Sequence, residues 1–199
     1  MRTWLSKGGA ISALVVGAAV WAGAEARGFL LLLVFFVTSS ALTRGGGRRG
    51  AAQVFANGGV AAACALLSHW YGALLPAFAG ALAAAAADTW STEIGARSAK
   101  PPRLITTWQS VEAGTDGGVS WLGSAGGALG ALVIAASALL LGLVSRPLAP
   151  MVALAGFVGA TLDSVAGATL QRRSWMNNDA VNLLATAAGA VVAAWLASR

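Results

Sequence analysis

The sequence is poor in charged residues and has almost no histidine or cysteine. Of its 199 residues, 10% are charged, and only one histidine and one cysteine are present. Cys64 therefore has no partner for an internal disulfide, and we expect it to be a small core residue. Neither a zinc-ligand cluster nor a Ser/His/Asp catalytic group can be assembled from this single histidine, His69, and this single cysteine.

Hydrophobic residues dominate the chain instead. They make up 57% of it, the mean hydropathy is +0.73, and apolar segments near the ~20-residue length that spans hydrocarbon recur. The runs are rich in Ala and Leu and lack the alternation of a transmembrane barrel, so strands are not expected. The sequence predicts a single integral membrane domain over residues 1–199, an all-α, polytopic transmembrane helix bundle. Its expected spans, about six or seven, are 9–24, 29–43, 53–68, 75–95, 120–143, 150–171 and 180–197.

The distribution of basic residues predicts the orientation of the bundle. If the N-terminus is cytoplasmic, ten Lys and Arg residues fall on the cytoplasmic side and three on the other, which fits the positive-inside rule. The same assignment places the polar connections 44–52, 96–119 and 172–179 on the cytoplasmic face. We therefore expect an integral protein of a prokaryotic plasma membrane with its active site facing the cytoplasm. The ten residues are Arg2, Lys7, Arg44, Arg48, Arg49, Arg97, Lys100, Arg103, Arg172 and Arg173.

Polar residues concentrate between Asp88 and Ser120. This stretch holds four of the seven carboxylates, passes through a loop with Pro101 and Pro102, and ends in a glycine-rich turn. A chain that buries nearly everything else in lipid and keeps one polar loop is expected to do its chemistry there. The four carboxylates are Asp88, Glu93, Glu112 and Asp116.

Asp88 and Asp163 each lie about two helical turns before the cytoplasmic end of a predicted span. An intramembrane carboxylate costs a few kcal/mol unless it is paired, solvated or metal-bound, and such a residue is functional by default. One interpretation is a structural pair bridged to arginine or to backbone donors. The sharper interpretation is that both help to hold Mg²⁺, which binds through one or two carboxylates plus substrate phosphates. Glu93 either binds the metal as well or pairs with Arg97 one turn later.

A glycine-rich segment precedes the span that begins at residue 120. Glycines before a helix start expose backbone N–H groups, and the helix dipole favours an anion there. A tight turn without a ligand is the alternative interpretation, and the missing Walker A lysine excludes a P-loop NTPase. The residues expected to bind phosphate here are Gly114, Thr115, Asp116, Gly117, Gly118 and Ser120.

Further arginines and amides on the same face are candidates for phosphate binding. Arginine forks suit phosphate neutralisation, although positive-inside anchoring also accounts for clusters such as 44–49 and 172–173. Asp179 is a candidate N-cap of the last helix, and the amides around it are assigned a ligand role as well. The residues assigned to this group are Arg48, Arg49, Arg103, Gln53, Asn57, Asn177, Asn178, Asp179 and Asn182.

Phosphoryl transfer fits this inventory, because it needs positioning, metal and charge neutralisation more than covalent help from the protein. If the acceptor is itself a phosphate, its oxygen is already anionic and a strong general base is dispensable. The location in the bilayer favours a lipid phosphate as the acceptor and a soluble nucleotide as the donor.

Six motifs also carry a resemblance: FFVTSSALTR, RRGAAQVFANGG, ADTWSTEIG, PRLITTWQSVEAGTDGGVS, GATLDSVAGATLQ and NNDAVNLLAT. In this order they resemble the DUF92 integral membrane family, which includes plant phytyl-phosphate kinase. The family is distantly similar to phytol and dolichol kinases and to CTP-dependent cytidylyltransferases. Gln109 is a departure, since the distant kinases have lysine there. The resemblance implies metal and nucleotide roles for Asp88, Glu93, Thr115, Asp116, Gly117, Gly118, Asp163, Asn178 and Asp179.

The resemblance implies a CTP-using kinase that converts an isoprenoid monophosphate to the diphosphate. We expect Mg²⁺ to be held by Asp88, Asp163 and Asp179, with Asp88, Asp163 and Glu93 as the catalytic set. The expected partners are CTP or another NTP, an isoprenoid monophosphate lipid and the membrane, with a homodimer left open and no nucleic acid. A cytidylyltransferase, which would attack the α-phosphorus and release pyrophosphate, is one alternative. A transporter of an anionic or lipid substrate is another, although it would need polar residues across the full membrane depth.

Overall fold

The computed structural model describes residues 4–43, 48–72 and 74–199. Arg2 and Arg44, two of the residues assigned to the cytoplasmic side, lie outside the described residues. The described chain is helical apart from one short hairpin and its connections, which confirms the predicted all-α membrane bundle. Its elements are α1 (Lys7–Leu42), α2 (Ala51–Leu67), α3 (Leu74–Gly95), β1 (Arg103–Leu104), β2 (Gly118–Val119), α4 (Trp121–Leu140), α5 (Leu148–Ala166), the π-helix η1 (Gly167–Gln171) and α6 (Asn178–Ala197).

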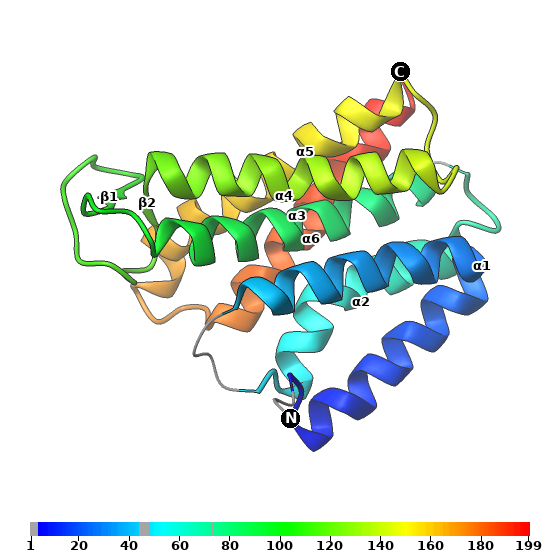
Figure 1. Cartoon of the computed structure of the whole chain (residues 1–199), viewed down its shortest axis with the longest axis horizontal. Helices are drawn as coiled ribbons and strands as arrows, with labels where there is room; N and C mark the ends of the chain where they lie inside the picture. The colour runs from blue at the N-terminus through cyan, green and yellow to red at the C-terminus, as the bar shows by residue number, and fades with distance from the viewer. Residues whose placement is uncertain (1–3, 44–47, 73) are drawn as a thin grey trace.

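α1 is a helical hairpin rather than one straight rod. Ala24 (φ −128°, ψ 15°) and Glu25 (φ 52°, ψ −158°) leave the helical region, and the two halves of α1 diverge from this bend in Figure 1. A positive φ is uncommon for a residue other than glycine, so Glu25 marks a genuine reversal of the chain. The two halves correspond to the predicted spans 9–24 and 29–43.

α3 forms the centre of the bundle. Every residue from Pro76 to Ala87 is buried, and α3 contacts each of the other five α-helices of the described chain. A helix that is apolar on all sides is typical of such a buried position. Asp88 follows this buried run directly, so the surrounding helices shield its side chain from lipid.

Small residues let the helices around α3 approach closely. An ideal Cβ on Gly80 of α3 would lie 2.5 Å from the Ala193 Cβ of α6. An ideal Cβ on Gly156 of α5 would lie 2.5 Å from the Ala83 Cβ of α3. Both distances are shorter than real carbon–carbon contacts, so larger residues would push the helices apart. Glycine and alanine are enriched at membrane helix interfaces for this reason.

The described parts of the polar connections border one cavity at the same end of the bundle, as predicted, and the 96–119 connection with its β1–β2 pair projects from that end in Figure 1. The opposite end holds the other chain reversals. There the His69 Nε2 atom lies 3.1 Å from the Ala22 carbonyl oxygen, and Gly142 lies beside the Arg27 guanidinium. The assignment of the polar end to the cytoplasm stays a prediction.

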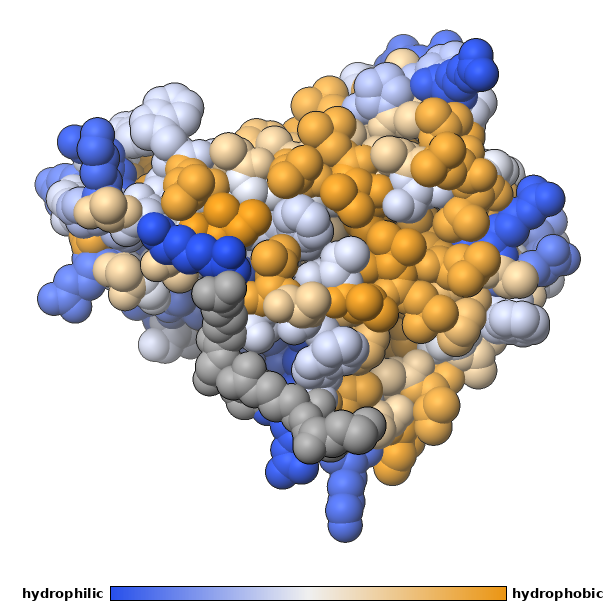
Figure 2. Space-filling model, viewed as in Figure 1, coloured by the Kyte–Doolittle hydropathy of each residue, from blue (hydrophilic) through white to orange (hydrophobic). Residues whose placement is uncertain are grey.

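Apolar side chains cover the middle of the molecule between its polar ends, and Figure 2 shows this belt on one face. Within the described chain, α1, α4, α5 with η1, and α6 are long and apolar enough to cross a membrane. Trp70, Trp121 and Trp175 are exposed close to helix ends. Tryptophans at such positions are typical of the membrane–water interface.

The connection between α3 and α4 folds back on itself through the antiparallel β1–β2 pair. Leu104 is buried and pairs with Gly118, and its N–H donates to the Gln109 carbonyl oxygen (2.9 Å). The Ile105 N–H donates to the Gly117 carbonyl oxygen (3.0 Å). These bonds hold the polar connection in a defined shape at the end of the bundle.

We predict that Gly80→Ala lowers the thermal stability of the purified protein, whereas Gly59→Ala maintains or raises it. The Gly80 variant places a methyl group 2.5 Å from the Gly189 carbonyl oxygen, and such overpacking costs about 1–3 kcal/mol. At Gly59 the nearest atom, in the Phe55 side chain, is 3.8 Å away, so the helix preference for alanine prevails. Melting in detergent measures both variants, and equal melting temperatures would contradict the packing described here.

Candidate functional site

A cavity of about 1270 Å³ opens at the polar end of the bundle. It lies between the ends of α2, α3, α4, α5 and α6, and the α3–α4 connection and η1 complete its wall. Three of the predicted site residues, Arg103, Asn177 and Asp179, do not line it. The predicted residues that do line it are Arg48, Arg49, Gln53, Asn57, Asp88, Glu93, Gly114, Thr115, Asp116, Gly117, Gly118, Ser120, Asp163, Asn178 and Asn182.

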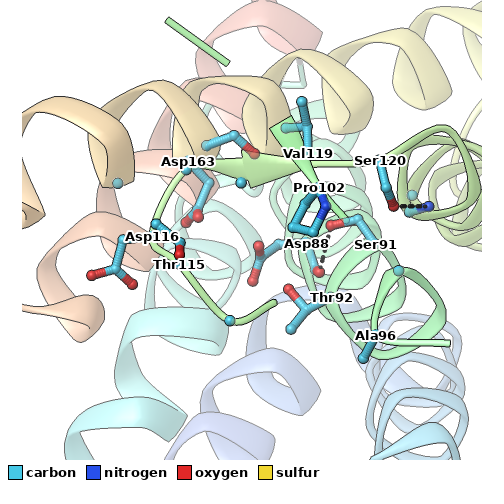
Figure 3. Close-up of a pocket in the computed structure, with 18 of the residues that line it drawn as sticks. Asp88, Ser91, Thr92, Ala96, Pro102, Thr115, Asp116, Val119, Ser120 and Asp163 are labelled. Carbon is cyan, nitrogen blue, oxygen red and sulfur yellow. Dashed lines mark hydrogen bonds between the residues drawn. The ribbon is translucent and has the colours of Figure 1, made fainter. Parts of the chain in front are cut away.

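Asp88 and Asp163 approach each other from α3 and α5. Their side chains point into the same space, beside Thr115, and they interact directly (Figure 3). The Asp163 Oδ2 atom is buried, and no group in the described parts of the chain donates a hydrogen bond to it. Asp116 adds a further negative charge near Asp163. Because adjacent carboxylates repel each other when both are ionised, the pair requires a proton or a cation.

The carboxylate pair fits the ligand chemistry of Mg²⁺. Its oxygens are hard donors, and the buried Asp163 Oδ2 atom is one oxygen left without a partner by the described residues. Those residues contain no group of three His, Cys, Asp or Glu side chains that could hold a metal by themselves. A Mg²⁺ ion at Asp88 and Asp163 would therefore complete its coordination with water and phosphate oxygens, as it commonly does.

The start of α6 differs from the prediction. Asn177, rather than Asp179, is the N-cap: its Oδ1 atom accepts a hydrogen bond from the Ala180 N–H at 2.9 Å. Asp179 lies in the first turn and does not line the cavity, so the structure does not bring it to the carboxylate pair. Its charge instead suits the positive end of the helix dipole. Asn178 and the buried Asn182 face the cavity.

The turn at 114–118 uses several of its own backbone donors. The Thr115 N–H donates to the Glu112 carbonyl oxygen just before the turn (3.2 Å), and the Gly118 N–H donates to the Thr115 carbonyl oxygen (2.9 Å). Gly167 packs against the Gly117 nitrogen: an ideal Cβ built on Gly167 would lie only 3.0 Å from that nitrogen. The row of free N–H groups predicted from the glycines is therefore shorter than expected. The Thr115 side chain is the hydroxyl that this turn presents to the cavity beside the carboxylate pair.

Arg49 is held firmly at the edge of the cavity. Its N–H donates to the Trp4 carbonyl oxygen (3.0 Å), and its carbonyl oxygen accepts from the Ser6 N–H (3.1 Å). The guanidinium lies 5.9 Å from the centre of the Phe36 ring. Burial lowers the pKa of Arg49 from its usual value, and the negative charge of Glu93 offsets part of this effect. A half-buried positive charge at this position suits an anionic ligand.

Three other arginines considered for phosphate binding do not reach the cavity. Arg103 donates from Nη1 to the Trp108 carbonyl oxygen (2.9 Å), and Arg173 lies over the Trp175 ring at 5.4 Å. Arg172 is exposed and does not line the cavity either. These three arginines lie in or beside turns, and their side chains point away from the cavity even though residues near them in sequence line it. The basic residues of the described chain that line the cavity are Arg48, Arg49 and Lys100.

Several hydroxyl and amide side chains in the cavity wall were not predicted from the sequence. Ser91 and Thr92 follow Asp88 within about one helical turn, and Ser164 follows Asp163 directly. The Ser91 Oγ atom donates to the Asp88 carbonyl oxygen at 2.9 Å. Helical spacing from the two carboxylates is the signal that predicts these residues. The additional hydroxyl and amide residues are Thr43, Thr89, Ser91, Thr92, Ser98, Ser110, Ser124, Thr161, Ser164 and Gln171.

Comparison with known proteins agrees with the resemblance that the motifs carry. Residues 1–190 match the family model described as integral membrane protein DUF92. The chain belongs to the DUF92 family. It is similar to an uncharacterized membrane protein of Methanocaldococcus jannaschii, with 38% identity over 141 residues that cover 70% of this chain and 58% of the relative.

Two proteins of Arabidopsis thaliana are also similar to this DUF92 protein. Protein PGR is 34% identical over 146 residues, covering 60% of this chain and 51% of the relative. Protein VTE6, which is chloroplastic, is 30% identical over 215 aligned positions, covering 96% of this chain and 65% of the relative. The chain thus spans from about half to two thirds of the length of these relatives. No solved structure matches it.

We predict that Gly117→Ala loosens the α3–α4 connection of this DUF92 protein more than Gly114→Ala does. Both glycines have positive φ (75° and 89°), so both variants carry backbone strain of about 1–2 kcal/mol. Only at Gly117 would the new Cβ also meet backbone, 2.5 Å from the Ala168 nitrogen of η1. Cleavage by trypsin after Arg97 and Arg103 should therefore accelerate in the Gly117 variant. Equal rates for the two variants would show that the turn does not pack on η1.

Proposed function

We propose that the protein is a membrane-embedded, Mg²⁺-dependent phosphotransferase that converts an isoprenoid monophosphate to the diphosphate with CTP or another NTP. The observation that carries this proposal is the half-buried Asp88–Asp163 pair, which faces a cavity with phosphate-binding groups on its wall. Phosphoryl transfer requires positioned phosphates and charge neutralisation, and it needs no nucleophilic side chain. Membership of the DUF92 family and the similarity to VTE6 support the same assignment.

The composition of the cavity wall supports a polyphosphate ligand. Arg48, Arg49 and Lys100 supply positive charge to the wall of the cavity that the carboxylate pair also lines. Arginine forks and ammonium groups bind phosphate oxygens, whereas carboxylates bind phosphate only through a shared metal ion. A wall that carries both kinds of group suits a nucleotide bound together with a divalent cation.

The proposed reaction proceeds by in-line displacement. A phosphate oxygen of the isoprenoid monophosphate attacks the γ-phosphorus, a new P–O bond forms, and the bond to the bridging oxygen breaks, so that the nucleoside diphosphate leaves. Arg48, Arg49 and Lys100 hold the phosphates and offset the charge that they bring together. Asn178, Asn182 and Thr115 donate hydrogen bonds that orient them. Mg²⁺ held by Asp88 and Asp163 would supply Lewis-acid neutralisation of the nucleotide phosphates.

The reaction is tested by incubating purified protein with Mg²⁺, each NTP and a panel of prenyl monophosphates, and by identifying the products by mass. The proposal predicts an isoprenoid diphosphate and a nucleoside diphosphate in equal amounts. Pyrophosphate together with a CDP-linked lipid would identify a cytidylyltransferase instead. The absence of a diphosphate with every donor and acceptor would overturn the kinase assignment.

We predict that Asp88→Asn lowers turnover about 10³-fold or more, because it removes a ligand whose metal contributes several kcal/mol of charge stabilisation. Glu25→Gln is the matched control, since it removes a carboxylate charge from the bend of α1, outside the cavity. Initial rates at saturating substrate, with protein of equal melting temperature, measure both variants. An active Asp88→Asn enzyme would remove this carboxylate from the mechanism.

A further inference from the structure

A second cavity, of about 630 Å³, lies between the two halves of α1 and the first turns of α2. Nearly all of its lining is hydrophobic, and its residues come from the inner sides of the α1 hairpin. Glycine and alanine keep it open: an ideal Cβ on Gly17 would already lie 3.2 Å from the Phe29 ring. We call this cavity the α1 groove.

The α1 groove has one closed end and one polar end. Trp21 and Phe29, which flank the bend of α1, stack edge to face at 5.5 Å and form the closed end. Arg49, Gln53 and Asn57 line the other end. The same three residues also line the cavity that contains the carboxylate pair, so the groove and the candidate active site adjoin at these side chains.

We propose that the α1 groove holds the hydrocarbon chain of the isoprenoid monophosphate, with its phosphate at Arg49 and the Trp21–Phe29 pair setting the chain length. This inference rests on the proposed function and names the binding site of the acceptor lipid. Among the described residues, Arg49 is the only basic side chain that lines the groove, and it lies at the end next to the candidate active site. This arrangement fits an amphiphile with an anionic head. The half-buried guanidinium complements a phosphate there.

The dimensions of the α1 groove limit the chain that fits it. From Ala10 to Trp21 the first half of α1 rises about 16 Å at roughly 1.5 Å per residue. An extended chain advances roughly 1.2 Å per bond, so about 13 main-chain bonds fit this distance. Since an isoprene unit adds four main-chain bonds, chains of about three to four units fill the groove up to Trp21 and Phe29.

Ala18→Phe tests the groove by filling it just before its closed end. We expect kcat/KM for geranylgeranyl monophosphate, with four isoprene units, to fall at least 10-fold while that for geranyl monophosphate, with two units, changes less than 2-fold. Ala63→Phe is the matched control, an exposed alanine on α2 that lines neither cavity, and it should leave both values unchanged. Equal losses for the two substrates, or equal effects of the two variants, would overturn the groove assignment.

Trp21→Ala tests the closed end in the opposite direction. Removing the indole opens the space beyond Phe29, so the ratio of kcat/KM for a five-unit chain over a four-unit chain should rise several-fold. An unchanged ratio would mean that the Trp21–Phe29 pair does not set chain length.

A photo-crosslinking experiment tests the site without requiring turnover. Geranylgeranyl monophosphate with a diazirine at the end of its chain should label peptides that contain Trp21 or Phe29. Excess geranylgeranyl monophosphate should abolish the labelling, whereas phosphatidylglycerol vesicles should not. Labelling elsewhere, or equal competition by the phospholipid, would overturn the groove assignment even if the enzyme makes diphosphate. Specific labelling without any diphosphate product would instead contradict the proposed kinase function and leave the groove assignment supported.

Discussion

The close approach of Asp88 and Asp163 in an apolar bundle is the constraint on which the rest of the structure depends. Two adjacent carboxylates inside a membrane protein are unfavourable unless a cation or a proton stabilises them, and the buried Asp163 Oδ2 atom lacks a donor among the described residues. The fold accepts this arrangement because α3 is enclosed by the other helices and delivers Asp88 to a polar cavity rather than to lipid. A cation bound between the two carboxylates would remove their repulsion.

Close packing of the helices brings the polar groups of the cavity together. Glycines such as Gly80 and Gly156 bring α5 and α6 against α3, so that Asp163 is carried to Asp88. Beyond Asp163, α5 continues as the π-helix η1, on which Gly117 of the α3–α4 connection rests. π-Helical turns are frequent at functional sites because they displace side chains from regular helical positions. The glycine turn therefore packs on η1, and η1 continues the helix that carries Asp163.

Hydropathy and composition suffice to predict the helix bundle, because each membrane span needs a long apolar segment. Asp88 and Asp163 are also evident from the sequence, because each is a carboxylate within such a segment. The sequence also predicts that the polar connections share one end. It does not predict which side chains face the cavity, since this depends on turns: Arg103 and Arg173 point outward, and Asn177 takes the cap expected at Asp179. Hydrogen bonds inside the glycine turn and the bend at Glu25 depend on backbone geometry, which has no counterpart in hydropathy.

We propose that Asp88 and Asp163 together bind a divalent cation with the nucleotide phosphates. Mn²⁺ can replace Mg²⁺ as a paramagnetic probe, and electron paramagnetic resonance then counts bound ions in the presence of a non-hydrolysable CTP analogue. We predict nucleotide-dependent Mn²⁺ binding to the unmodified protein that weakens about 10-fold or more when Asp163 is changed to Asn. Unchanged Mn²⁺ affinity in that variant would contradict it.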